Sequence, residues 1–173
     1  SMKYHITPIN KVRELREDDF LVSKTNPKGI ITYGNKIFIE FSQYSEAELL
    51  GAQHNIVRHP DMPRAVFNLL WGTIAKKQEI FAYVKNMSKD GGAYWVFANV
   101  TASLDEQSNI IGYYSVRRKP RASGVKTAAE LYREMISIEK RVGTKDGIFA
   151  STEYLLGILS KGGMSYEEFV LSL

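Results

Sequence analysis

The sequence predicts an α+β fold, with short helices on one face of a five-stranded antiparallel sheet. Two β-rich runs come first, a helical segment follows, and three further β-rich runs come last. Short turns join neighbouring runs, which favours antiparallel pairing with the helices gathered on one face. At 173 residues, 44% hydrophobic and 24% charged, the chain has the size and composition of one folded domain with an appendage.

Composition excludes several classes of protein. Without cysteine there can be no disulfide, no thiolate metal site, no cysteine nucleophile and no flavin–cysteine photoadduct. No apolar run approaches the roughly 20 residues that span a bilayer, and the first residues do not resemble a signal peptide, so we expect a cytoplasmic protein. The net charge of +4 is spread along the chain apart from residues 117–121. We interpret that cluster as a solvated strand end and expect no nucleic-acid partner.

The first elements are a cap and a hairpin. Residues 1–18 are expected to form an N-terminal cap, with a helical tendency at 12–17. Residues 20–25 and 29–34 are rich in β-formers and are separated by Asn-Pro-Lys-Gly, which is typical of a turn.

Helices come next. One is predicted over 36–42 and another over 45–50, where Ser45 and Glu48 fit a capping box and Gly51 fits a helix stop. A longer helix follows residue 63. It has two apolar stripes, which predicts cover on two sides: Val66, Leu69, Leu70, Thr73 and Ile74 form one stripe, and Phe67 and Trp71 the other.

Three strands complete the domain, over 80–86, 93–104 and 110–119. In the long middle strand, alternate residues from Tyr94 to Ala102 share one face, and Trp95, Phe97, Asn99 and Thr101 share the other. We expect room for a ligand between the helices and this sheet.

Residues 121–173 differ in character. Residues 122–124 are predicted to be a linker, followed by a helix over about 127–142, a break at 143–147, a second helix that runs to 159, and a last apolar segment over 165–173. We therefore divide the chain into a cap (1–18), a sensor domain (19–120) and a C-terminal helical extension (121–173). The apolar tail needs a surface to pack against, in its own domain or on a partner.

The segment from Asn55 to Pro63 is unusual because Arg58, His59 and Asp61 crowd together where the long helix begins. Arg58 could bind a diphosphate, stack on a ring or be solvated. His59 precedes a proline and is held extended, with its role open. Asp61 is expected to cap the helix.

A family resemblance adds to this reading. The chain resembles the PAS domain of Aer-type bacterial aerotaxis receptors over roughly residues 20–120. The segments that carry the resemblance are Asn55–Pro63, Leu70–Trp71, Val84–Asn86, Tyr94–Val96 and Ile111–Tyr113. The resemblance implies a PAS fold, non-covalent FAD and a report of redox state to chemotaxis signalling. The lack of a transmembrane or signalling segment favours a stand-alone form, similar to CetB of bipartite energy-taxis systems.

The resemblance also implies specific residues. It places Arg58, His59 and Asp61 in the flavin-binding segment, with Asn35, Trp71 and Asn86 as further pocket positions. The family's usual Gly-Glu-Pro-Trp is replaced here by Lys-Gln-Glu-Ile, ending at Ile80. An aromatic side chain is therefore lost from the pocket, or its role is taken by Phe81 or Tyr83.

The leading functional hypothesis is a redox sensor that binds FAD and signals to a membrane-bound chemotaxis transducer by protein contact. A homodimer through the sheet face or the helical extensions is a further expectation. The alternatives are a cofactor-free PAS adaptor and a haem sensor with His5, His54 or His59 as axial ligand. We expect no enzyme, because no cluster combines a nucleophile, a base and an orienting group.

Overall fold

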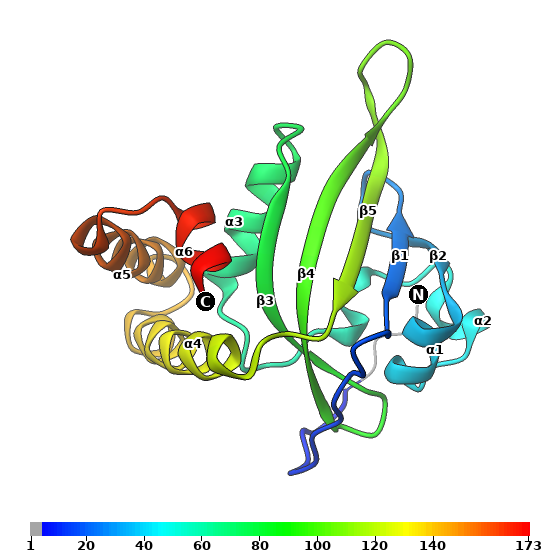
Figure 1. The fold of residues 1–173 in the computed structure, drawn as a ribbon, viewed down its shortest axis with the longest axis horizontal. Coiled ribbons are helices and arrows are strands. Elements are labelled where there is room, and N and C mark those ends of the chain that lie inside the picture. The colour runs from blue at the N-terminus through cyan, green and yellow to red at the C-terminus, as the bar shows by residue number, and fades with distance from the viewer. Residues whose placement is uncertain (1–4) are drawn as a thin grey trace.

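The computed structural model describes residues 5–173 and contains one five-stranded antiparallel sheet in the order β2-β1-β5-β4-β3. The strands are β1 (Leu21–Thr25), β2 (Ile31–Gly34), β3 (Ile80–Met87), β4 (Ala93–Leu104) and β5 (Ile110–Arg118). Between β2 and β3 lie α1 (Lys36–Ser42), α2 (Glu46–Leu49), the short 3-10 helix η1 (His54–Val57) and α3 (Arg64–Ile74). The predicted α+β class and strand pairing are confirmed (Figure 1).

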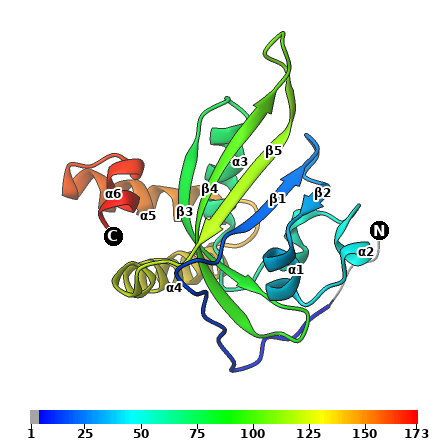
Figure 2. The same cartoon turned by 45° about the vertical axis from the view of Figure 1, so that its right-hand side comes forward.

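Helices lie at both edges of the sheet, and α3 packs against β3 and β4. In both views α1 and α2 lie towards β1 and β2, whereas α4 (Ala122–Val142), α5 (Gly147–Gly162) and α6 (Tyr166–Ser172) lie beyond β3 (Figure 2). Ser45 and Glu48 form the predicted capping box at α2. None of the helices formed by residues 5–173 is long and apolar enough to cross a bilayer.

The N-terminal residues do not form the helical turn suggested by residues 12–17. Residues 9–13 lie beside the β3–β4 turn: Ile9 N–H donates to the carbonyl of Gly91, and Arg13 N–H to that of Ala93. Arg13 also forms an ion pair with Asp90. Partners distant in sequence thus decide the conformation of this segment.

The predicted linker at residues 122–124 is the first turn of α4 instead. Gly124 is buried against Tyr83, and a Cβ atom built on it would lie 2.3 Å from the Tyr83 hydroxyl oxygen. The glycine therefore permits close packing of helix on strand, which its usual association with linkers conceals.

The C-terminal helices cover the free edge of the sheet at β3. The Tyr132 hydroxyl of α4 donates to the Tyr83 carbonyl at 2.6 Å, and the Tyr166 hydroxyl of α6 donates to the Phe81 carbonyl at 2.9 Å. Further along the same edge, Lys85 N–H donates to the sulfur of Met62 at 3.2 Å. These contacts leave little of the β3 edge open to pairing with another chain.

Candidate ligand cavity

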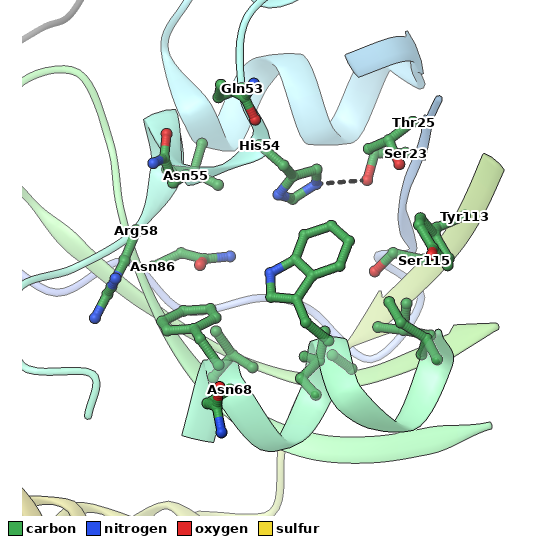
Figure 3. Close-up of a pocket in the computed structure, with 18 of the residues that line it drawn as sticks. Ser23, Thr25, Gln53, His54, Asn55, Arg58, Asn68, Asn86, Tyr113 and Ser115 are labelled. Carbon is green, nitrogen blue, oxygen red and sulfur yellow. Dashed lines mark hydrogen bonds between the residues drawn. The ribbon is translucent and has the colours of Figure 1, made fainter. Parts of the chain in front are cut away.

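A cavity of about 590 Å³ lies between α3 and the inner face of the sheet (Figure 3). Its floor is formed by small side chains on adjacent strands, among them Ala98 and Val100 on β4 and Ser115 on β5. Small residues at these inward positions leave space that α3 does not fill. The volume is in the range of small-molecule and cofactor pockets.

Aromatic side chains form the wall contributed by α3. Phe67 and Trp71 both line the cavity, and the Trp71 ring meets Tyr113 of β5 edge-on with 5.4 Å between ring centroids. A Cβ atom on Gly29 would lie 3.1 Å from the Trp71 indole, so this ring reaches from α3 to the β1–β2 turn. Trp71 is 38% exposed, so part of this wall also faces solvent.

Arg58 lines the cavity at its margin. Its guanidinium carbon lies 4.5 Å from the centre of the Phe67 ring, and one of its nitrogens donates to the Met62 carbonyl at 3.3 Å. Burial lowers the pKa of Arg58. An isolated β-bridge pairs Arg58 with Asn86 on the free edge of β3, which brings two of the predicted residues side by side.

Asn86 is 4% exposed and its side chain points into the cavity (Figure 3). Its register partner on β4 is Tyr94, whose hydroxyl has no hydrogen-bond partner within residues 5–173, and burial raises the pKa of that hydroxyl. A side-chain amide can donate through nitrogen and accept through oxygen, so Asn86 can meet either requirement of a ligand atom.

A hydrogen-bonded cluster of Ser23, His54 and Arg117 also lines the cavity. Arg117 donates to His54 Nε2 at 3.2 Å and to Ser23 Oγ at 2.8 Å, and Ser23 Oγ lies 2.9 Å from the same His54 nitrogen. Because arginine can only donate, Nε2 is the acceptor and the imidazole proton belongs on Nδ1. Burial and the Arg117 cation lower the pKa of His54 to about 3, so the ring is neutral.

Two buried polar atoms of the cavity lining have no hydrogen-bond partner within residues 5–173, Thr25 Oγ1 and Arg117 Nε. An unpaired buried polar group typically costs 1–3 kcal/mol. The lining therefore offers unused donor and acceptor capacity, which fits a ligand that is polar on part of its surface.

Three predicted residues do not line the cavity. The Asn35 side chain instead accepts from the N–H groups of Val22 and Phe38 at 3.0 Å each and caps α1, so its amide is used within the fold. His59 is buried, and its Nδ1 accepts from Asp61 N–H at 3.0 Å. Asp61 is exposed and pairs with Lys85 at 2.8 Å.

The expected helix cap at Asp61 is wrong, because α3 begins after Pro63 and Asp61 lies outside it. The first N–H groups of α3 are paired with a residue of the C-terminal extension. The carboxylate of Glu139 accepts from Arg64 N–H at 2.8 Å and from Ala65 N–H at 3.2 Å. Ile148 of α5 also lines the cavity. The extension therefore contacts the first residues of α3 and contributes one side chain to the cavity lining.

Neither Phe81 nor Tyr83 takes over from the aromatic that Ile80 replaces. Ile80 is buried in a cluster with Leu70 and Ile74, while Phe81 and Tyr83 both pack on Phe97 away from the cavity. The aromatic walls come from Trp71, Phe67 and Tyr113.

The sequence interpretation missed the polar groups on β1 and β5. Arg117 was expected to be a solvated strand end, but it is 3% exposed. The alternation of side chains along a β-strand could have shown that Arg117 points inward, because Tyr113, Ser115 and Arg117 share one face of β5 and all line the cavity. No group of three or more acidic or histidine side chains in the described part of the chain could hold a metal ion.

Comparison with known proteins agrees with this architecture. The family model described as "PAS fold" matches residues 31–117. The chain is 38% identical over 121 residues to the aerotaxis receptor of Escherichia coli K12, which covers 70% of this chain and 24% of the receptor. It is 29% identical over 97 residues to the nitrogen fixation regulatory protein of Klebsiella pneumoniae, covering 56% of this chain and 20% of the regulator.

Solved structures show the same fold. The dark-state structure of the blue-light photoreceptor Aureochrome1 LOV aligns with a TM-score of 0.56 at 24% identity, over 64% of this chain and 82% of that one. A Light-Oxygen-Voltage domain studied with a flavin analogue aligns with a TM-score of 0.56 at 21% identity, over 62% and 81%. The chain spans about a quarter of the aerotaxis receptor and about a fifth of the nitrogen fixation regulator. With half of its length matched by the family model, the chain belongs to the PAS-fold family.

Proposed function

We propose that the cavity binds FAD non-covalently and that the protein is a redox sensor of the energy-taxis kind. The observation that carries this is a cavity of about 590 Å³ that combines aromatic walls with the buried amide of Asn86 and two unpaired polar atoms. A flavin ring has both an apolar body and a polar edge. Support also comes from the similarity to a protein named aerotaxis receptor and to a domain studied with a flavin analogue.

The donors available in the cavity fit such a ligand. Trp71 and Phe67 supply aromatic surface to the lining, which also contains arginine and amide side chains. When bound, FAD would supply a redox centre whose N5 atom accepts a hydrogen bond when oxidised and donates one when reduced. Asn86 is the residue proposed to follow that change, by rotating its amide. Among the six residues inferred from the resemblance, Arg58, Trp71 and Asn86 stay candidates for direct contact.

The signal would leave through the C-terminal helices. Asn86 lies on β3, whose outer edge accepts hydrogen bonds from Tyr132 and Tyr166. The first residue of α3 is hydrogen-bonded to Glu139. A rotation of the Asn86 amide could therefore shift the balance between two arrangements of α4 against β3. The proposed receiver is a membrane-bound chemotaxis transducer, contacted from the cytoplasm, and the proposed action involves no catalysis.

Two alternatives find less support. A cofactor-free adaptor with a collapsed cavity does not fit a cavity of this volume. A haem sensor needs a histidine nitrogen with a free lone pair, but His54 Nε2 already accepts from Arg117 and lies beside Ser23. His59 Nδ1 accepts from Asp61 N–H, and neither His59 nor His5 lines the cavity.

The test is to purify the protein and record its absorption spectrum before and after reconstitution with FAD. Flavin bands that stay with the protein through gel filtration are expected. An Asn86→Asp or Asn86→Ala protein should still fold, but lose the redox-dependent change in the contacts of α4, measured by hydrogen exchange. Asn99, which lies on the other face of the adjacent strand β4 and does not line the cavity, provides the control as Asn99→Ala. Wild-type protein that retains no flavin after reconstitution would exclude the proposal.

A further inference from the structure

Arg117 is a buried cation without a buried anion to balance it. Within residues 5–173, the other buried side chains that carry a full charge, Asp19 and Glu139, each have an arginine close by. Arg117 is 3% exposed, and its polar contacts, Ser23 and His54, are both neutral. An uncompensated buried charge costs several kcal/mol even after the protein relaxes around it.

The surroundings of Arg117 stabilise the guanidinium only in part. The guanidinium carbon lies 4.6 Å from the centre of the Phe38 ring, and the His54 ring stacks on Phe38 from 5.8 Å. Its Nε has no partner in the described part of the chain, and burial lowers the pKa of Arg117 to about 10, so the side chain is still charged near neutral pH. The cavity therefore holds a fixed positive charge at its inner wall.

We propose that Arg117, held by Ser23 and His54, is a binding site for a negatively charged oxygen or nitrogen of the ligand, and that this group is the pyrimidine end of the flavin ring. This rests on the proposed function. It assigns a role to the cluster that the six residues inferred from the resemblance do not include.

The number of charges favours the ring over the pyrophosphate. A pyrophosphate brings two negative charges, and one buried arginine with neutral neighbours would leave the second uncompensated. The flavin ring gains only one negative charge when it is reduced. When it accepts two electrons and one proton, which goes to N5, a single negative charge remains over N1 and the C2 oxygen. A cation placed there stabilises the reduced anion more than the neutral oxidised ring. Arg117 would therefore raise the reduction potential of the bound flavin.

The experiment compares wild type with Arg117→Met and Arg117→Gln, which remove the charge, and with Arg117→Lys, which keeps it. Arg118 supplies the control as Arg118→Met, because it is the next residue on β5, carries the same charge and is exposed outside the cavity. Dissociation constants are measured anaerobically for riboflavin, FMN and FAD, each oxidised and each reduced with dithionite as the two-electron donor.

The expected result is that the neutral variants bind reduced flavin at least tenfold more weakly relative to oxidised flavin than wild type does. For a two-electron couple, tenfold corresponds to about 30 mV in potential. The loss should be equal for riboflavin, which has no phosphate, and for FAD. Arg117→Lys should keep most of the preference, and Arg118→Met all of it.

Other outcomes overturn the assignment. An unchanged ratio in both neutral variants means that Arg117 does not contact the ring, and a loss confined to FMN and FAD means that it binds phosphate instead. The ligand-free variants should melt no lower than wild type, since a buried charge is removed; a large loss of stability in both would assign Arg117 to folding. Wild type that binds no flavin overturns the proposed function, whereas flavin binding with an unchanged ratio overturns this assignment alone.

Discussion

The carboxylate of Glu139 on α4 accepts a hydrogen bond of 2.8 Å from the backbone N–H of Arg64, the first residue of α3. Residues 75 positions apart thereby form a helix cap, because Pro63 has no side chain that could accept from these groups. The negative charge also lies at the positive end of the α3 dipole. Since Phe67 and Trp71 of the same helix line the cavity, Glu139 connects the C-terminal extension to the ligand site.

Replacing Glu139 should therefore destabilise the protein and weaken ligand binding together. Glu139→Gln keeps the shape but loses the charge, and should lower the free energy of unfolding by about 1 kcal/mol. Glu139→Ala leaves both N–H groups unpaired in a buried place and should cost about 2 kcal/mol. Urea denaturation measures the free energy of unfolding of both variants. Glu134→Gln, exposed on the same helix, is the control and should change little. Equal stabilities for the Glu139 and Glu134 variants would contradict the cap.

Two glycines of the extension should respond in opposite directions to alanine. At Gly124 a new Cβ would meet the Tyr83 hydroxyl oxygen at 2.3 Å, so Gly124→Ala should force α4 away from β3 and lower stability by about 1–3 kcal/mol. Gly157 in α5 has no atom within 4 Å of such a Cβ. Gly157→Ala should therefore stabilise by about 0.5–1 kcal/mol through helix propensity. Thermal melting of the pair measures both, and a stable Gly124→Ala protein would rule out the tight contact.

Acid should destabilise the protein through His54. Its pKa falls from an ordinary 6.5 to about 3 in the folded state, because it is buried beside Arg117. The unfolded chain therefore binds the proton first. Stability is complete above pH 6.5 and declines as the pH falls towards 3, by up to about 1.4 kcal/mol per unit. Burial and Lys85 also lower the pKa of His59, which gives the same sign.

His54→Gln isolates this contribution, because glutamine can still accept from Arg117. Between pH 6.5 and 4.5, above the range of most carboxylates, the variant should lose less stability than wild type. His59→Gln provides the comparison for the second histidine. Identical pH profiles for wild type and His54→Gln, measured by urea denaturation, would show that His54 is not held neutral by the fold.

The elements could be predicted from the sequence because their signals are local. The alternation in β4, the turn at Asn26–Gly29 and the capping box of Ser45 each depend on a few neighbouring residues, and all three predictions agree with the structure. The errors involve contacts between distant residues. Glu139 reads as one more surface charge of an amphipathic helix, and Gly124 as a linker glycine, until α4 is placed on β3.

The candidate site divides in the same way. Arg58, Trp71 and Asn86 were inferred from the resemblance and do line the cavity. Arg117 lies in a basic run whose composition indicates a solvated strand end, and only its place on the inward face of β5 shows that it is buried. Asn35 was inferred from the resemblance but does not line the cavity. Its side chain caps α1, and a polar residue before a helix can take that role regardless of any ligand nearby.

The two tryptophans provide a test of where the flavin binds. Trp71 lines the cavity, whereas Trp95 is on the other face of the sheet, stacked on Tyr132 with ring centroids 6.1 Å apart. Contact with a flavin ring should quench Trp71 strongly, and Trp95 should be quenched only by energy transfer through the sheet. Addition of FAD should therefore reduce the fluorescence of Trp95→Phe, which retains Trp71, more than that of Trp71→Phe.

Trp71→Ala should also lose about 1 kcal/mol of binding free energy, roughly fivefold in the dissociation constant, through the missing aromatic contact. Equal quenching in the two phenylalanine variants, with unchanged affinity in Trp71→Ala, would place the flavin away from α3 and leave the cavity to another ligand.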